Sequence, residues 1–265
     1  MNREELKKRL AKIGIGDNRY SLNGELIADR IVLYPNYSKW EVFYFSERGT
    51  REHYQVFPSE EQACQCIFDM IEDELQRMAF DAVSQDKMDL AIARFKEVLS
   101  IDPCREQAWM ALYDIYLHTD IPSAYHLLQT VYALMPTDFN VLSKMASFYL
   151  RVKNDREKAK EYSDLLLKTY PSDARAYYIV GGNLLSVDHP KAMEMLHRAI
   201  ELDESYILPY ITLAVQYERA KEYQKAYDLL KKGYQKGDDS KPGRGSRFEL
   251  KYHMERIEKN IRKPY

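Results

Sequence analysis

Three short runs rich in β-branched and aromatic residues predict strands near the start of the chain: residues 30–34, 39–45 and 52–57. Turn-forming residues separate them, with Pro35-Asn36 after the first and Ser46–Gly49 after the second. Residues 3–13 form an amphipathic pattern that Gly14 ends. We therefore expect a short helix followed by a three-stranded antiparallel sheet.

The pattern changes to helical spacing at residue 59. Ser59–Gln62 fits a capping box, and the helix that it opens carries Ala63, Cys66, Ile67, Met70 and Ile71 on its apolar side. Neither Gly nor Pro occurs from residue 59 to residue 85. This helix is therefore expected to continue beyond the small N-terminal domain and to join it rigidly to the next part of the chain.

A repeat of about 34 residues follows, over about residues 72–238. The repeat ends are Ile101–Pro103, Leu134–Pro136, Thr169–Pro171 and Leu202–Glu204, separated by 33, 35 and 33 residues. Large residues stand at the first slot of each repeat: Leu75, Trp109, Leu142, Tyr177 and Tyr210. The slot four residues later, where two helices approach closely, holds Ala79, Tyr113, Ala146, Gly181 and Ala214. The second helix carries Ala91, Ala124, Ala159, Ala192 and Ala226.

These slots resemble the tetratricopeptide pattern W-x2-L-G-x2-Y, A-x3-F, P, and five copies span residues 72–238. The predicted fold class is mainly α, a tetratricopeptide-type α-solenoid with a small N-terminal α+β domain. The resemblance implies that first helices line a concave groove, where a partner protein or peptide binds. The implied groove residues are Gln76, Phe80, Met110, Asp114, Ser143, Ser147, Tyr178, Gly182, Ile211 and Val215. Chaperone-binding members place Lys and Asn at such positions, and these are absent here.

The predicted domains are residues 1–71, an α+β head, residues 72–238, the repeats, and residues 239–265, a linker with a capping helix. The helix is expected over 246–263, and Gly243 and Gly245 indicate a loose link before it. An interaction of this cap with an acidic partner is the alternative to a solvated cap.

Charge varies along the chain, although the net value is only −2. Residues 59–238 hold 21 Lys/Arg against 29 Asp/Glu, so the repeats are acidic while both flanks are slightly basic. The negative charge of the repeats disfavours the binding of nucleic acid and favours a basic partner. The longest stretch without a charged side chain, residues 121–137, contains two prolines and is no membrane span. Three cysteines and a charged N-terminus predict a reducing, cytoplasmic location.

Nothing in the sequence predicts catalysis, a cofactor or a metal site. The pair Glu194 and His197 shares a helical face but lacks the further ligands of a di-iron bundle. His253–Glu255 lacks the paired cysteines of a deaminase, and the few glycines form no phosphate-binding loop. We therefore expect a protein that is not an enzyme, with an enzyme as the remote alternative.

The N-terminal segment resembles small bacterial immunity-protein domains of polymorphic toxin systems. The residues that carry this resemblance are Arg19–Gly24, Lys39–Tyr44, Ser46–Gly49, Val56-Phe57 and Ser59–Ala63, within residues 1–75. Such domains bind and block a toxin, although they usually stand alone. The resemblance implies a toxin-neutralising role, for which a general assembly adaptor is the alternative.

The uncharged second helix of the second repeat raises a further question. Tyr125 and Tyr132 lie on faces that usually carry Lys and Glu. We expect these residues to pack against the next repeat; because tyrosine-rich faces are common at interfaces, contact with the head or with a second copy is the alternative.

Overall fold

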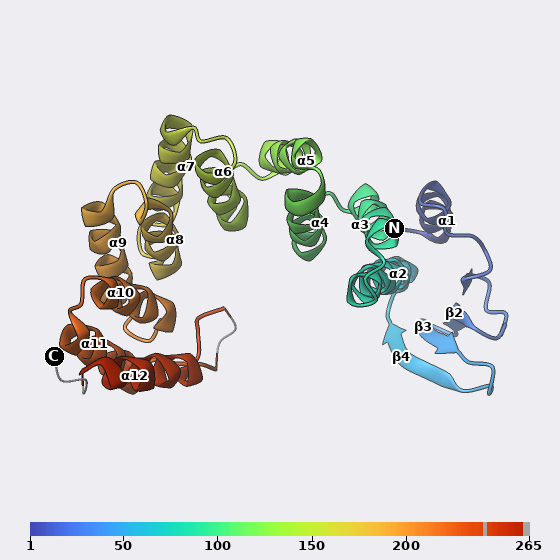
Figure 1. The fold of residues 1–265 in the computed structure, drawn as a ribbon. Helices are drawn as coiled ribbons and strands as arrows, with labels where there is room; N and C mark the ends of the chain where they lie inside the picture. The colour runs from blue at the N-terminus through green and yellow to red at the C-terminus, as the bar shows by residue number, and fades with distance from the viewer. Residues whose placement is uncertain (241–242, 262–265) are drawn as a thin grey trace. The chain divides into compact units, whose positions relative to one another are not determined.

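In the computed structural model the chain forms two compact units, Met1–Val131 and Tyr132–Tyr265, which are described separately (Figure 1). The structure describes residues 1–240 and 243–261. The boundary lies within the helix α5 (Ile121–Leu134) and differs from the predicted domain limits at residues 71 and 238. Those limits stay predictions.

The first unit begins with α1 (Arg3–Lys12) and a four-stranded sheet of order β1-β2-β3-β4. The strands β2 (Arg30–Asn36), β3 (Lys39–Phe45) and β4 (Arg51–Phe57) form the predicted antiparallel meander. The sequence pattern did not reveal β1 (Tyr20–Ser21), which pairs in parallel with β2. A strand of two residues is too short to show any periodicity.

The long helix α2 (Glu60–Ser84) confirms the predicted continuity. The Ser59 hydroxyl accepts a hydrogen bond from the Gln62 amide at 3.3 Å, which caps the first turn. Ala63, Cys64 and Ile67 are fully buried on the part of α2 that packs against α1 and the sheet. Leu75, Ala79 and Ala82 are buried further along, where α3 packs. The predicted limit between residues 71 and 72 therefore lies inside one uninterrupted helix.

The helices after α2 alternate as the repeat period requires, so the α-solenoid prediction is confirmed (Figure 1). The first unit continues with α3 (Met88–Ile101), α4 (Glu106–Thr119) and most of α5. The second unit contains α6 (Phe139–Arg151), α7 (Arg156–Thr169), α8 (Ala174–Leu184), α9 (His189–Leu202), α10 (Ile207–Arg219), α11 (Tyr223–Lys236) and α12 (Arg247–Ile261).

Small residues occupy the close-contact slot for the expected reason. A Cβ added to Gly181 would lie 2.9 Å from Cγ of Leu196 on the paired helix α9. Ala79, Ala146 and Ala214 are also buried. Tyr113, the one large residue in this slot, is buried as well, and burial raises the pKa of its hydroxyl.

The predicted capping helix corresponds to α12, within the expected range 246–263; residues 262–265 and 241–242 lie outside the described part of the chain. Leu250 and Ile257 are buried on α12 and join a cluster with Leu213 of α10 and Leu230 of α11. The helix thus covers apolar surface that the last repeat would otherwise expose.

The loop before α12 is held on the first turn of α10. The Arg244 carbonyl accepts hydrogen bonds from the amides of Ile207 and Leu208, both at 3.1 Å. Because α10 has no side-chain cap, this carbonyl pairs amides that the helix cannot satisfy itself. A Cβ on Gly245, whose φ is +87°, would lie 2.8 Å from Cγ2 of Ile207. The expected loose link is therefore wrong at Gly245, which fits closely against α10.

The Arg244 side chain fixes the same loop. Its guanidinium forms an ion pair with Asp203 and lies over the ring of Tyr206, 5.1 Å from the ring centre. We expect Arg244→Ala to lower the free energy of unfolding by about 1–2 kcal/mol, because it removes a partly buried charged pair together with a cation–π contact. Urea unfolding followed by circular dichroism measures this change. Lys251→Ala, on the exposed side of α12, should change the stability by less than about 0.5 kcal/mol.

The loss of stability in Arg244→Ala should depend on pH. Burial favours a higher pKa for Asp203, but hydrogen bonds from Ser205 and Arg244 outweigh it and hold this pKa below the ordinary value of 3.8. A carboxylate with a lowered pKa stabilises the fold above its ordinary value and loses that contribution as pH falls through the lowered one. The difference between wild type and Arg244→Ala should therefore narrow below pH 3.8. A difference that stays constant there would contradict the role given to this pair.

Candidate protein-binding surface

In the first unit, the four predicted groove residues lie on α2 and α4. Phe80 is 39% exposed and meets the ring of Phe95 edge-on at 5.1 Å between centres. Met110 is half-buried, and Asp114 is exposed. The side chain of Gln76 is engaged within the chain, because it donates a hydrogen bond to Gln107 at 2.7 Å and accepts one from Arg105 at 2.9 Å. Phe80 thus offers the largest apolar surface of the four.

Arg105 joins the first repeat to the second through α2. Besides Gln76, it forms ion pairs with Asp73 and, at 3.6 Å, with one oxygen of Glu72. The other oxygen of Glu72 is buried and has no hydrogen-bond partner among the described residues. Burial raises the pKa of Glu72, and the charge of Arg105 opposes this shift. Sequence reasoning missed this group, although Glu72 shares the helical face of Leu75 and Ala79, where a charge is unusual.

In the second unit, the other six predicted residues lie on the first helices α6, α8 and α10. We call them the unit 2 face: Ser143, Ser147, Tyr178, Gly182, Ile211 and Val215. Ser143 is only 8% exposed, and its hydroxyl donates to the Phe139 carbonyl at 2.7 Å, so it offers little surface. The other five are half-buried.

Hydrogen bonds between polar side chains connect α6 and α8 at the unit 2 face. Asn183 is buried and donates to the Ser147 hydroxyl at 3.1 Å, while Arg151 approaches its amide oxygen at 3.4 Å. Sequence reasoning placed Ser147 but missed Asn183, since an asparagine beside two glycines looks like an ordinary exposed residue. These contacts fix the adjoining first helices at this point.

Beside these polar side chains the surface is open. A Cβ added to Gly182 would meet no heavy atom of the described residues within 4 Å. Tyr178, one turn earlier on α8, packs edge-on against Tyr206 at 5.3 Å. Ile211 and Tyr178 both pack against the buried cluster of the last repeats while keeping part of their surface accessible. The unit 2 face thus combines an empty position with apolar and polar neighbours.

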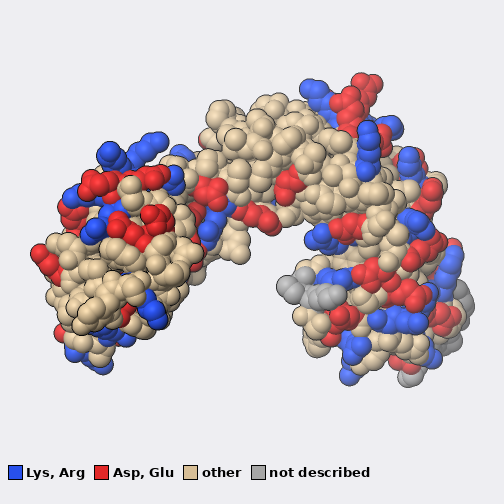
Figure 2. Space-filling model, turned by 180° about the vertical axis from the view of Figure 1, so that it is seen from behind, with Lys and Arg blue, Asp and Glu red and all other residues tan. Residues whose placement is uncertain are grey.

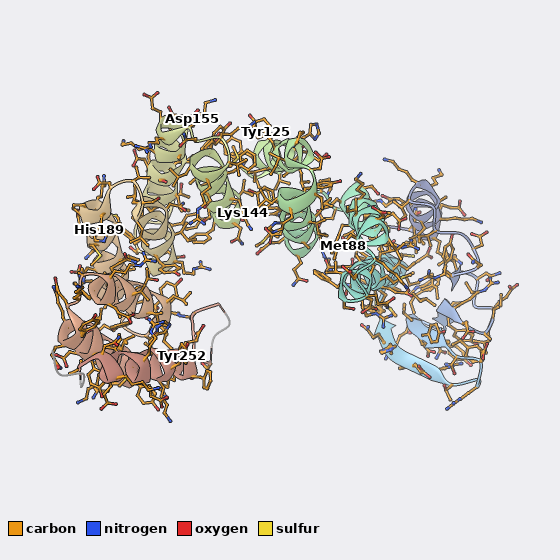
Figure 3. The ribbon with its side chains drawn as sticks, in the orientation of Figure 1. Met88, Tyr125, Lys144, Asp155, His189 and Tyr252 are labelled. Atoms are coloured by element: carbon orange, nitrogen blue, oxygen red, sulfur yellow. The ribbon has the colours of Figure 1, made fainter. Side chains whose placement is uncertain are left out.

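The uncharged helix α5 is visible as an area without coloured charges (Figure 2). Tyr132 packs edge-on against Tyr162, 5.4 Å between ring centres, so ordinary packing within the chain accounts for part of its surface. Tyr125, labelled on α5 in Figure 3, is half-buried and has contacts within the chain. Contact of either residue with a second copy stays a prediction.

The described residues hold no group of three His, Cys, Asp or Glu side chains able to bind a metal ion. His197 instead bonds the hydroxyl of Tyr217 at 3.1 Å. Asp155 and His189 lie at the starts of α7 and α9, as Figure 3 shows, away from each other along the repeats. Among residues 1–240 and 243–261, none of the helices is both long and apolar enough for a membrane crossing.

Solved structures share this fold at low sequence identity. No protein-family model matches the chain, and no curated protein sequence matches it. PilF of Pseudomonas aeruginosa is 19% identical with a TM-score of 0.50, over 73% of this chain and 85% of that one. Yeast Tom70 is 15% identical with a TM-score of 0.55, over 72% of this chain and 40% of that one. A thermophilic TPR protein of Thermus thermophilus is 18% identical with a TM-score of 0.50, over 70% of this chain and 98% of that one. The fold of the chain is thus that of tetratricopeptide repeat proteins.

Proposed function

We propose that the chain is a protein-interaction scaffold whose unit 2 face holds a segment of another protein. The open position at Gly182 is the observation that carries this proposal. On α8 this position is next to Asn183, which bonds Ser147, and one turn after the partly accessible side chain of Tyr178. Such a surface accepts a side chain of a partner without displacing any part of the chain.

The charge of the repeats indicates which kind of partner is favoured. The acidic balance of residues 59–238 favours a basic protein, but the excess lies in residues 59–131 of the first unit, with 5 Lys/Arg against 14 Asp/Glu, and not in the unit 2 face. A toxin-neutralising role, in a cytoplasmic setting, is a narrower form of this proposal, and a general assembly adaptor is the broader one. One dominant partner captured from cells would favour the first, whereas several complexes would favour the second.

The proposal predicts that filling the position of Gly182 abolishes partner capture without unfolding the chain. We expect Gly182→Leu to reduce the captured partner about tenfold or more, because the added side chain occupies the space that the partner needs. The thermal unfolding midpoint should stay the same or rise, since leucine favours the helix more than glycine. Affinity capture from the source cells with quantitative mass spectrometry measures the change.

Glu194→Leu is the matched control, because it adds the same side chain to an exposed position on the second helix α9. Capture by this variant should equal that of wild type. Equal capture by Gly182→Leu and wild type would exclude the unit 2 face as the binding surface.

A further inference from the structure

The strand β4 forms an exposed edge of the head sheet. Its only strand neighbour among the described residues is β3, and Figure 1 shows it at one side of the sheet. The six residues from Arg51 to Val56 are all exposed. In an antiparallel pair, alternate residues direct their N–H and C=O groups away from the neighbouring strand. The outer side of β4 thus presents backbone donors and acceptors that an added strand can pair with.

A bulge limits the length of this edge. The pairing with β3 passes from Val42 opposite Gln55 to Tyr44 opposite Glu52, so two residues of β4 stand opposite one of β3. His53, with φ of +54°, makes the bulge possible and bends the strand. Regular pairing with β3 is therefore limited to Gln55–Phe57. Together with Tyr54, which follows the bend at His53, they form the four-residue stretch with which an added strand would pair.

A cleft runs between α2 and the sheet and reaches this edge at Gln55 and Phe57. It consists of two adjoining cavities of about 660 and 410 Å³ that share Met70 and Asp73. Gln55 and Phe57 line it from β4. The α2 residues that line the second cavity recur at helical spacing: Gln62, Gln65, Cys66, Asp69, Met70 and Asp73. A strand added to β4 would direct every second side chain into this α2–β4 cleft.

The α2–β4 cleft is acidic. Five carboxylate residues line it, Asp29, Glu52, Asp69, Asp73 and Glu74, against two arginines, Arg19 and Arg77. Two of these carboxylates already have a cationic partner: Glu74 is paired with Arg19 at 2.5 Å, and Asp73 is paired with Arg105. Asp69 accepts from the neutral amide of Gln65 at 2.8 Å, and Glu52 accepts from the Thr50 hydroxyl at 3.1 Å. Among the described residues neither of these two carboxylates has a cationic partner, so the cleft favours Lys and Arg side chains.

The opposite side of the same edge presents Tyr54 and Val56, beside the ion pair of Arg51 with Glu41. Tyr54 is 48% exposed and stacks on Phe43 at 6.1 Å between ring centres. Val56, 44% exposed, stands opposite Glu41 of β3 on this face. The side chains of an added strand that point away from the cleft would meet these two residues.

We propose that β4 accepts an extended segment of a partner protein as a fifth strand, and that this segment alternates basic with apolar residues. The basic side chains enter the α2–β4 cleft, and the apolar ones cover Tyr54 and Val56. Main-chain hydrogen bonds supply affinity, and the two faces of the edge supply specificity. This surface lies in the first unit, so the proposal stands or fails separately from the one made for the unit 2 face.

A peptide that alternates lysine and valine over about eight residues, with blocked ends, tests the proposal on the full chain. Hydrogen exchange should show added protection of amides within Tyr54–Phe57 when the peptide is present. Fluorescence anisotropy with the labelled peptide gives the dissociation constant. A peptide with glutamate in place of lysine should bind about tenfold more weakly or worse.

The variant Asp69→Lys should weaken binding of the lysine peptide about tenfold, since it reverses a charge inside the cleft. Asp81→Lys makes the same change on the same helix, about 18 Å further along the axis. This control should alter the affinity less than about twofold, because the distance exceeds the screening length.

Three results would overturn the proposal. One is an unchanged exchange rate at Tyr54–Phe57 with peptide bound, and another is equal weakening by Asp81→Lys and Asp69→Lys. The third is protection of the same amides that rises with protein concentration in the absence of peptide, which would show that a second copy of the chain covers β4. Circular dichroism of both variants confirms that any loss of binding does not come from unfolding.

Discussion

Gly181→Val is expected to lower the free energy of unfolding of the second unit by about 2–3 kcal/mol. A Cβ at this position would lie 2.9 Å from Cγ of Leu196 and 3.2 Å from the carbonyl oxygen of Ala192. Leu196 is fully buried, and the carbonyl belongs to the backbone of α9, so neither can move away without separating the two helices. Urea unfolding followed by circular dichroism measures the loss.

Gly182→Val is the matched control for this prediction. It makes the same substitution one residue later on the same helix, where an added Cβ meets open space. Its stability should be unchanged or slightly higher, because valine fits a helix better than glycine. A similar loss in both variants would show that the helix, not the contact with α9, is sensitive to the substitution.

Local and periodic features of the sequence predicted most of the fold. The 34-residue repeat placed Gly181 at a close helix contact, and the structure confirms that contact. The absence of Gly and Pro between residues 59 and 85 predicted α2 as one helix. These features succeed because they depend on neighbours in the same helix or on a period that recurs five times.

The polar contacts between elements could not be predicted in the same way. Asn183 bonds Ser147 from 36 residues away, Arg105 reaches Asp73 from 32, and Arg244 reaches Asp203 from 41. In the sequence each of these looks like an ordinary surface residue. Only the packing of successive helices brings the partners together, and the crossing angles of those helices cannot be read from the sequence.

The open surfaces were also outside the reach of sequence reasoning. Gly182 was selected by its position in the repeat, but the space beside it is known only from the structure. The sequence predicted β4 as the last strand of an antiparallel meander, and therefore at an edge, but it showed neither the bulge at His53 nor the cleft along α2. The cleft depends on how the sheet packs against α2, which local patterns do not determine.

Trp109→Ala is expected to have the largest effect of the substitutions considered, a loss of about 3–5 kcal/mol in the first unit. Trp109 occupies the first slot of the second repeat on α4, which packs against α3, and it has no exposed surface. Truncation to alanine leaves a cavity that the neighbouring helices cannot close completely. In this variant Trp40 of β3 is the sole remaining tryptophan, so its fluorescence reports unfolding of the head.

Trp109→Phe separates packing from hydrogen bonding at the same position. The indole Nε1 of Trp109 is buried and has no hydrogen-bond partner among the described residues. A phenyl ring keeps most of the apolar contacts and removes only this unpaired donor, so the loss should stay below about 2 kcal/mol. A loss as large as that of Trp109→Ala would mean that the indole N–H has an acceptor in solution, such as a buried water. Because the head and the first repeat share α2, Trp109→Ala should lower the urea midpoint seen at Trp40 together with that of the helical signal.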